Sequence, residues 1–145
     1  MTLNRKDTRH ELAEFLAANM PTPKNVLPSL PATFKGQSPL VCIVGAPTDR
    51  RDDTAISHEN KFGLSVRLVV LYYIENDKTW TPEMAEDLLD LLEYELAAAV
   101  KLANRTTGHT WRALSRQGFS QIDPIKQDGV TYLQEAIYFI AEVDG

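Results

Sequence analysis

The sequence lacks three features that would place it in a specialised class of protein. It has a single cysteine, Cys42, so it cannot form an internal disulfide and fits a reducing compartment. Its longest apolar run covers residues 68–74, far short of the roughly 20 residues that a membrane-spanning helix needs. Residues 1–12 contain no apolar core, so we expect no secretory signal. We therefore expect neither a membrane protein nor a disulfide-stabilised secreted protein.

Basic residues are also scarce. The 15 Lys and Arg are outnumbered by 20 Asp and Glu, which gives a net charge of −5. A dedicated nucleic-acid-binding protein normally carries a basic excess, so this balance argues against that class. The remaining composition is that of an ordinary globular chain, with 145 residues, 43% hydrophobic and 24% charged. We predict a single domain over residues 1–145.

The N-terminal third predicts one helix and one irregular segment. Thr8 and Glu11 have capping-box spacing, and residues 4–7 can add a further turn. The helix ends before Pro21, and its apolar face consists of Leu12, Phe15, Leu16 and Met20. Five prolines between positions 21 and 39 predict an extended, edge-like segment. We expect four of its side chains to reach the core: Val26, Leu27, Leu30 and Phe34.

Two strands with a long polar connection follow. The β-branched run at residues 40–44 predicts a buried strand, and the alternation over residues 62–74 predicts a longer one. Residues 46–61 form a charged loop whose length is typical of functional segments. Its bases and acids nearly balance: Arg50, Arg51 and Lys61 against Asp49, Asp52, Asp53 and Glu59.

A second helix is the clearest element in the sequence. Thr81 is a good N-cap, Pro82 suits the first helical position, and Arg105 lies near the C-terminal end. The buried stripe is predicted to consist of Ala85, Leu88, Leu89, Leu92, Leu96, Ala99 and Ala103. Met84, Leu91 and Leu102 widen this stripe towards half of the circumference. We therefore expect the helix to touch more than a flat sheet, either the first helix or another subunit.

The C-terminal part predicts two further strands. Residues 111–122 form a strand with an irregularity near Gly118, turns follow at residues 123–124 and 127–129, and residues 130–143 form the closing strand. The element order is helix–strands–helix–strands. It indicates an α+β fold, with a mostly antiparallel β-sheet and two helices packed on one face.

The residues that could carry chemistry do not form a convincing site. His58 and Glu59 could act as metal ligands together with Asp49, Asp52 and Asp53, but the spacing of known metal sites is missing and two arginines lie among the acids. Cys42 lies in an apolar strand without a nearby base, so it is expected to be inert. No phosphate-binding, dinucleotide-binding or hydrolase motif is present. We therefore predict no enzyme and no catalytic, cofactor or metal site.

With its elements in order, the chain resembles the tail terminator proteins of long-tailed bacteriophages, also called tail completion or minor tail proteins. The likeness covers nearly the whole length. It includes the N-terminal helix, the proline-punctuated segment leading into residues 39–45 (PLVCIVG), and the charged loop before the alternating strand at 62–73. It also includes the helix opened by Thr81-Pro82-Glu83, Gly118-Phe119 within a strand, and Asp128-Gly129 before the last strand.

This resemblance implies a structural protein of the virion that assembles in the host cytoplasm. Its subunits would form a homo-oligomeric ring, a hexamer in that family, at the head-proximal end of the tail. The ring would cap the tail tube, end its polymerisation and join the head-completion or connector proteins, with sheath as a further partner if the tail is contractile. DNA would pass through the lumen without specific binding. A ring also needs two different patches on each subunit.

Nine residues are candidates for subunit or partner contacts: Asp49, Arg50, Arg51, Asp52, Asp53, His58, Met84, Leu91 and Leu102. Two alternatives remain open. Another neck component or a tail-tube-like protein could be built from similar elements, and a tube protein would polymerise instead of closing one ring. A small cytosolic enzyme or ligand-binding domain would need a pocket with convergent polar groups, and the sequence suggests none.

Overall fold

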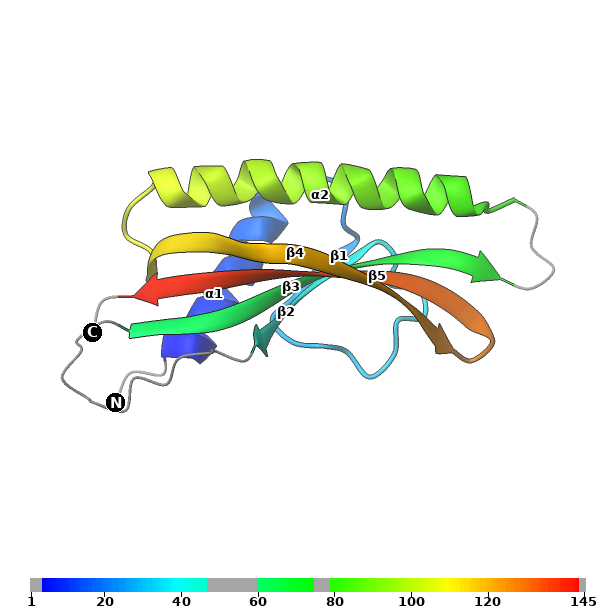
Figure 1. Cartoon of the computed structure of the whole chain (residues 1–145), viewed down its shortest axis with the longest axis horizontal. Coiled ribbons are helices and arrows are strands. Elements are labelled where there is room, and N and C mark those ends of the chain that lie inside the picture. The colour runs from blue at the N-terminus through cyan, green and yellow to red at the C-terminus, as the bar shows by residue number, and fades with distance from the viewer. Residues whose placement is uncertain (1–3, 47–59, 75–78, 144–145) are drawn as a thin grey trace.

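A five-stranded sheet with two helices forms the structure, a computed structural model that describes residues 4–46, 60–74 and 79–143 (Figure 1). The helices are α1 (Asn4–Asn19) and α2 (Pro82–Arg105). The strands are β1 (Asn25–Leu27), β2 (Leu40–Ala46), β3 (Asn60–Ile74), β4 (Trp111–Gln127) and β5 (Val130–Val143). Their order in the sheet is β1-β2-β3-β5-β4. Only the short β1 pairs in parallel, so the predicted α+β fold with a mostly antiparallel sheet is confirmed.

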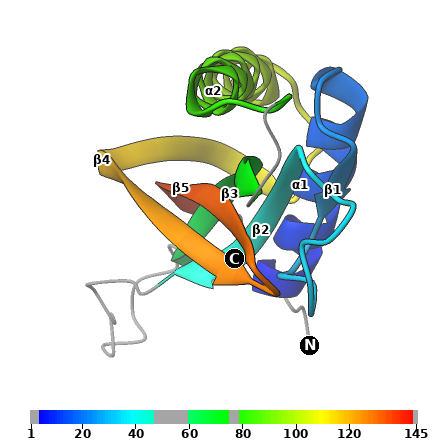
Figure 2. The same cartoon turned by 90° about the vertical axis from the view of Figure 1, so that its right-hand side faces the viewer.

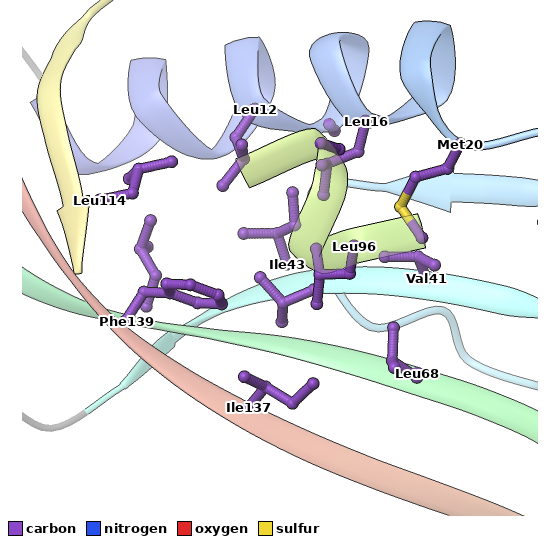
Figure 3. Packing of buried hydrophobic residues seen from close by; sticks show 14 of the residues in the cluster. Leu12, Leu16, Met20, Val41, Ile43, Leu68, Leu96, Leu114, Ile137 and Phe139 are labelled. Carbon is purple, nitrogen blue, oxygen red and sulfur yellow. The ribbon is translucent and has the colours of Figure 1, made fainter. Parts of the chain in front are cut away.

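Both helices cover the same face of the sheet. Alternate residues of β3 and β5 point towards them, because successive side chains of a strand lie on opposite faces. The resulting core joins both helices to the four longer strands, and Figure 3 labels ten of its side chains: Leu12, Leu16, Met20, Val41, Ile43, Leu68, Leu96, Leu114, Ile137 and Phe139. The alternation over residues 62–74 therefore predicted the buried face of β3 correctly.

The start of α2 is also as predicted. Thr81 is the N-cap, its hydroxyl accepts a hydrogen bond from the Met84 N–H, and Pro82 opens the helix. Six of the seven residues in the predicted stripe are buried, and Leu88 packs at the edge of the core, half-buried.

The predicted capping box of α1 is wrong. The helix begins at Asn4, so Thr8 lies within it, buried. Glu11 instead accepts hydrogen bonds from the N–H and hydroxyl of Thr110, and its carboxylate lies 2.7 Å from His109 Nδ1. The His109 ring stacks on Trp111 with centroids 4.3 Å apart. The Glu11 side chain, which the local pattern assigned to a cap, thus makes a long-range contact instead. This contact ties α1 to the start of β4.

The proline-rich segment after α1 behaves only partly as predicted. Its short strand β1 pairs at the sheet edge, and Val26 and Leu27 are half-buried. Phe34 crosses to the other face of the sheet, where it packs on Tyr132 in a second, smaller cluster with Leu40, Cys42 and Val69. Leu30 is 43% exposed, so its predicted place in the core is wrong.

The last two strands form a long hairpin. A register shift between Gln117 and Gln121 confirms the irregularity predicted near Gly118. Asp128 and Gly129 both have positive φ, 50° and 78°, which fits a two-residue type I′ turn. The predicted turn at Asp123-Pro124 is wrong, because β4 continues through Pro124 to the hairpin. Since β4 is an edge strand, a proline without an N–H is tolerated there.

Candidate assembly surface

Cys42 is the one cysteine of the chain, and it lies buried in β2. Burial raises the pKa of the Cys42 thiol to about 12, although the nearby Arg67 partly opposes this shift, so the thiol stays protonated at neutral pH. Within residues 4–46, 60–74 and 79–143, no group of three or more His, Cys, Asp or Glu is placed to hold a metal ion. No helix in those ranges is long and apolar enough to cross a membrane.

Six of the nine candidate contact residues lie outside the described residues: Asp49, Arg50, Arg51, Asp52, Asp53 and His58. Strands β2 and β3 extend into the two ends of the loop that was predicted at residues 46–61. Ala46 belongs to β2, and Asn60 and Lys61 belong to β3. Ala46 pairs with Gly63 in an antiparallel register, so the two ends of the connection are fixed side by side at one end of the sheet.

The other three candidates lie together on α2. Met84, Leu91 and Leu102 are 43%, 45% and 42% exposed, and no described element covers them fully. They are separated by 7 and 11 residues, close to whole numbers of helical turns, so they share one side of the helix. We call these three residues the α2 flank. Exposed large apolar side chains on one side of a helix are candidates for a contact surface.

The contacts of two other α2 residues, Glu95 and Glu93, show which side of the subunit the α2 flank faces. Glu95 accepts hydrogen bonds from the N–H and hydroxyl of Thr22, just after α1. Glu93 pairs with Arg116 of β4 at 3.2 Å, and about 200° of helix rotation separates it from Glu95. Leu91 lies four residues before Glu95, hence on the α1 side. Figure 2 shows α1 and the bend of β4 on opposite sides of α2.

A second exposed apolar feature is the bend in β4, which we call the β4 bulge and define as Gly118–Ser120. Gly118 has φ of 61°, a conformation that glycine adopts without steric cost. Phe119 follows it with 97% of its surface exposed, and Ile122 is exposed nearby. The sequence indicated an irregular strand here, but it did not indicate that the bend would turn a phenylalanine into solvent.

A buried polar cluster lies beneath the bulge. Glu135 of β5 is only 2% exposed and accepts a hydrogen bond of 2.6 Å from the Ser120 hydroxyl. Burial raises the pKa of Glu135 and the neighbouring Glu93 raises it further, while the Ser120 hydrogen bond and Arg116 lower it; the net direction is upward. Sequence reasoning missed Glu135. Its signal was the two-residue spacing from Leu133 and Ile137, which places it on the core face.

The edge of β4 before the bulge is capped at one residue, Leu114. The Asn104 side chain of α2 donates to the Leu114 carbonyl at 2.9 Å and accepts from the Leu114 N–H at 2.8 Å. These two bonds satisfy backbone groups that an edge strand would otherwise offer to another strand. Asn104 and Glu135 therefore fix the positions of β4 on both sides of Phe119.

We expect Glu135→Gln to stabilise the protein at neutral pH. A raised pKa means that the folded protein binds the proton of Glu135 more tightly than the unfolded chain does. The contribution of Glu135 to the free energy of unfolding is therefore lost as pH rises from 4.5, the ordinary pKa of this group, through its raised pKa in the folded protein. Gln keeps an acceptor for Ser120 and removes the buried charge, which should add about 1 kcal/mol at pH 8. Thermal unfolding of both proteins between pH 4 and 8 measures this, with the exposed Glu86→Gln as the control. A Glu135→Gln variant that is less stable than the wild type by the same amount at pH 4 and at pH 8 would contradict this prediction.

No protein-family model matches the chain, and no curated protein matches it either. Function is therefore inferred from the exposed surfaces of this chain and from the order of its elements.

Proposed function

We propose that this protein is a structural virion component whose subunits form a ring that caps a bacteriophage tail tube. The ring ends tube polymerisation and presents a joining surface to head-completion proteins. The observation that carries the proposal is the α2 flank, where Met84, Leu91 and Leu102 stay exposed beside a well-packed core. Burying such a row against another subunit is favourable, since each square ångström of apolar surface removed from water contributes roughly 25 cal/mol. The resemblance in element order supplies the tail-tube part of the proposal.

Light scattering after size exclusion, over a range of protein and Mg²⁺ concentrations, tests ring formation. Negative-stain images of each peak should show closed rings with a central hole. Open fibres would instead favour a tail-tube protein, because a head-to-tail contact that does not close produces a filament. If the chain stays monomeric, a capping assay on purified tail tubes decides whether the ring closes only at the tube tip.

Removal of residues 50–57 should abolish capping and leave the fold intact. This segment is the centre of the charged 46–61 loop, which exceeds the length needed for a connection. The flanking strands pair from Leu40↔Val69 to Ala46↔Gly63, so their register does not depend on residues 50–57. The measurement is tube length in a capping assay, with thermal unfolding as the control for folding. Normal capping by the shortened chain would contradict a contact through this loop.

A further inference from the structure

The α2 flank and the β4 bulge are the two halves of one contact between neighbouring copies. We propose that Phe119 of one copy packs on the α2 flank of the next, in a head-to-tail arrangement. The inference rests on the proposed ring, and it names the surfaces that would build it. It requires the two features to lie on different sides of the subunit, to match in polarity and charge, and to be held in place before association.

The two features do lie on different sides. The α2 flank is on the side of α2 that faces Thr22, and the bulge is on the side that faces Arg116 (Figure 2). One patch therefore cannot meet the other within the same molecule. A contact between unlike patches on opposite sides of a subunit is heterologous, and repetition of it produces either a ring or a filament.

The apolar surfaces are matched in kind. Phe119 is the most exposed of the large apolar side chains among the described residues, and Ile122 extends its apolar surface. The α2 flank offers two leucines and Met84, whose flexible thioether adapts to a neighbouring shape. A phenylalanine packed against such side chains is the kind of anchor that dominates binding energy at interfaces.

The strand on both sides of Phe119 is held in place before binding. Ser120 is fixed by its hydrogen bond to Glu135, and Leu114 by two hydrogen bonds to Asn104. The bulge therefore loses little conformational freedom when a partner arrives, which favours association.

The charges favour a second copy of this chain as the occupant. Between residues 83 and 95, α2 carries six acids and no base. The strand β4 carries three bases, Arg112, Arg116 and Lys126, and one acid, Asp123. Arg112 and Arg116 already contact Glu142 and Glu93 of their own chain, and Lys126 extends the positive strand beyond the bulge. Two of the three bases are therefore neutralised within the chain, and Lys126 is the base of β4 that can approach the acidic helix of a neighbouring copy. A symmetric contact between two α2 flanks would leave Phe119 in water.

The test uses two variants of the full chain, Phe119→Asp and Leu91→Asp, each alone and as an equimolar mixture. Both side chains are exposed, so thermal unfolding of each variant should stay within a few degrees of the wild type at a protein concentration where the wild type is dissociated. Each substitution places a charge in the apolar contact, and we expect it to raise the dissociation constant of the wild-type assembly by at least about 30-fold. The mixture should form a heterodimer, because Phe119→Asp keeps an intact α2 flank and Leu91→Asp keeps an intact bulge. The conservative Phe119→Leu should retain assembly.

Three results would overturn the contact. The first is a Phe119→Asp variant that assembles like the wild type, which would point to symmetric α2 pairing if Leu91→Asp alone dissociates. The second is a mixture without heterodimer. The third is a wild-type chain that stays monomeric up to about 1 mM and whose Phe119→Asp variant caps tubes as the wild type does. The tube-capping assay separates this inference from the proposed function. Capping by Phe119→Asp would overturn the contact alone, whereas rings that form through this contact and fail to cap would overturn the function alone.

Discussion

Replacing Leu96 with Ala is expected to lower the free energy of unfolding by about 2–5 kcal/mol. Leu96 is fully buried, and Figure 3 shows its side chain on α2 beside Leu16 of α1 and Ile43 of β2. The substitution removes apolar contacts by which α2 packs on α1 and on the sheet. These three elements cannot all move to fill the cavity that the smaller side chain leaves. Urea unfolding followed by circular dichroism, at the lowest protein concentration that the signal allows, measures the change.

Leu91→Ala is the matched control, because it is the same substitution on the same helix at an exposed position. It should change the free energy of unfolding by about 0.5 kcal/mol or less in the dissociated chain. If Leu96→Ala were as mild as the control, the junction between the two helices and the sheet would not be the centre of the core.

The elements that could be predicted from the sequence are those whose signals are local. The Thr81 cap and the apolar stripe fix both the start and the buried side of α2 within one helix length. The alternation in β3 likewise fixes which side chains face the helices. The exposed Met84 follows from the same pattern, since it lies at the margin of a stripe wider than one sheet can cover.

The errors occur where a distant segment decides the outcome. Glu11 has the spacing of a cap, but Thr110, 99 positions away, offers it two hydrogen bonds. The local sequence around Pro124 predicts a turn, but an edge strand tolerates a proline, and β4 lies at the edge of the sheet. The order of strands in a sheet cannot be predicted from a local pattern. Exposure of Phe119 depends on how the β4 bulge bends over Glu135, which again needs the paired strand.

Replacing Glu11 with Gln is expected to lower the free energy of unfolding by about 1.5–3 kcal/mol at pH 7, the size of hydrogen bonds to a charged group. Its carboxylate joins α1 to the segment before β4, with Thr110 N–H at 2.8 Å and His109 Nδ1 at 2.7 Å. Burial raises the pKa of Glu11, but the hydrogen bonds from Thr110 and His109 outweigh it and the pKa is lowered. An amide has one acceptor oxygen, so it cannot replace both sets of contacts.

The pH dependence of this loss distinguishes the charge from simple packing. A lowered pKa means that the unfolded chain binds the proton more tightly, so the contribution of Glu11 is complete above its ordinary value of 4.5 and is lost as pH falls through the folded pKa. The difference between wild type and Glu11→Gln should therefore narrow below about pH 4.5. Glu14→Gln, exposed on the same helix, should show no difference at any pH. A Glu11→Gln deficit that is equally large at pH 3 and pH 7 would show that the carboxylate acts by shape alone. The sign is opposite to that expected for Glu135, so the same acid-to-amide change should weaken the protein at the half-buried Glu11 and strengthen it at the buried Glu135.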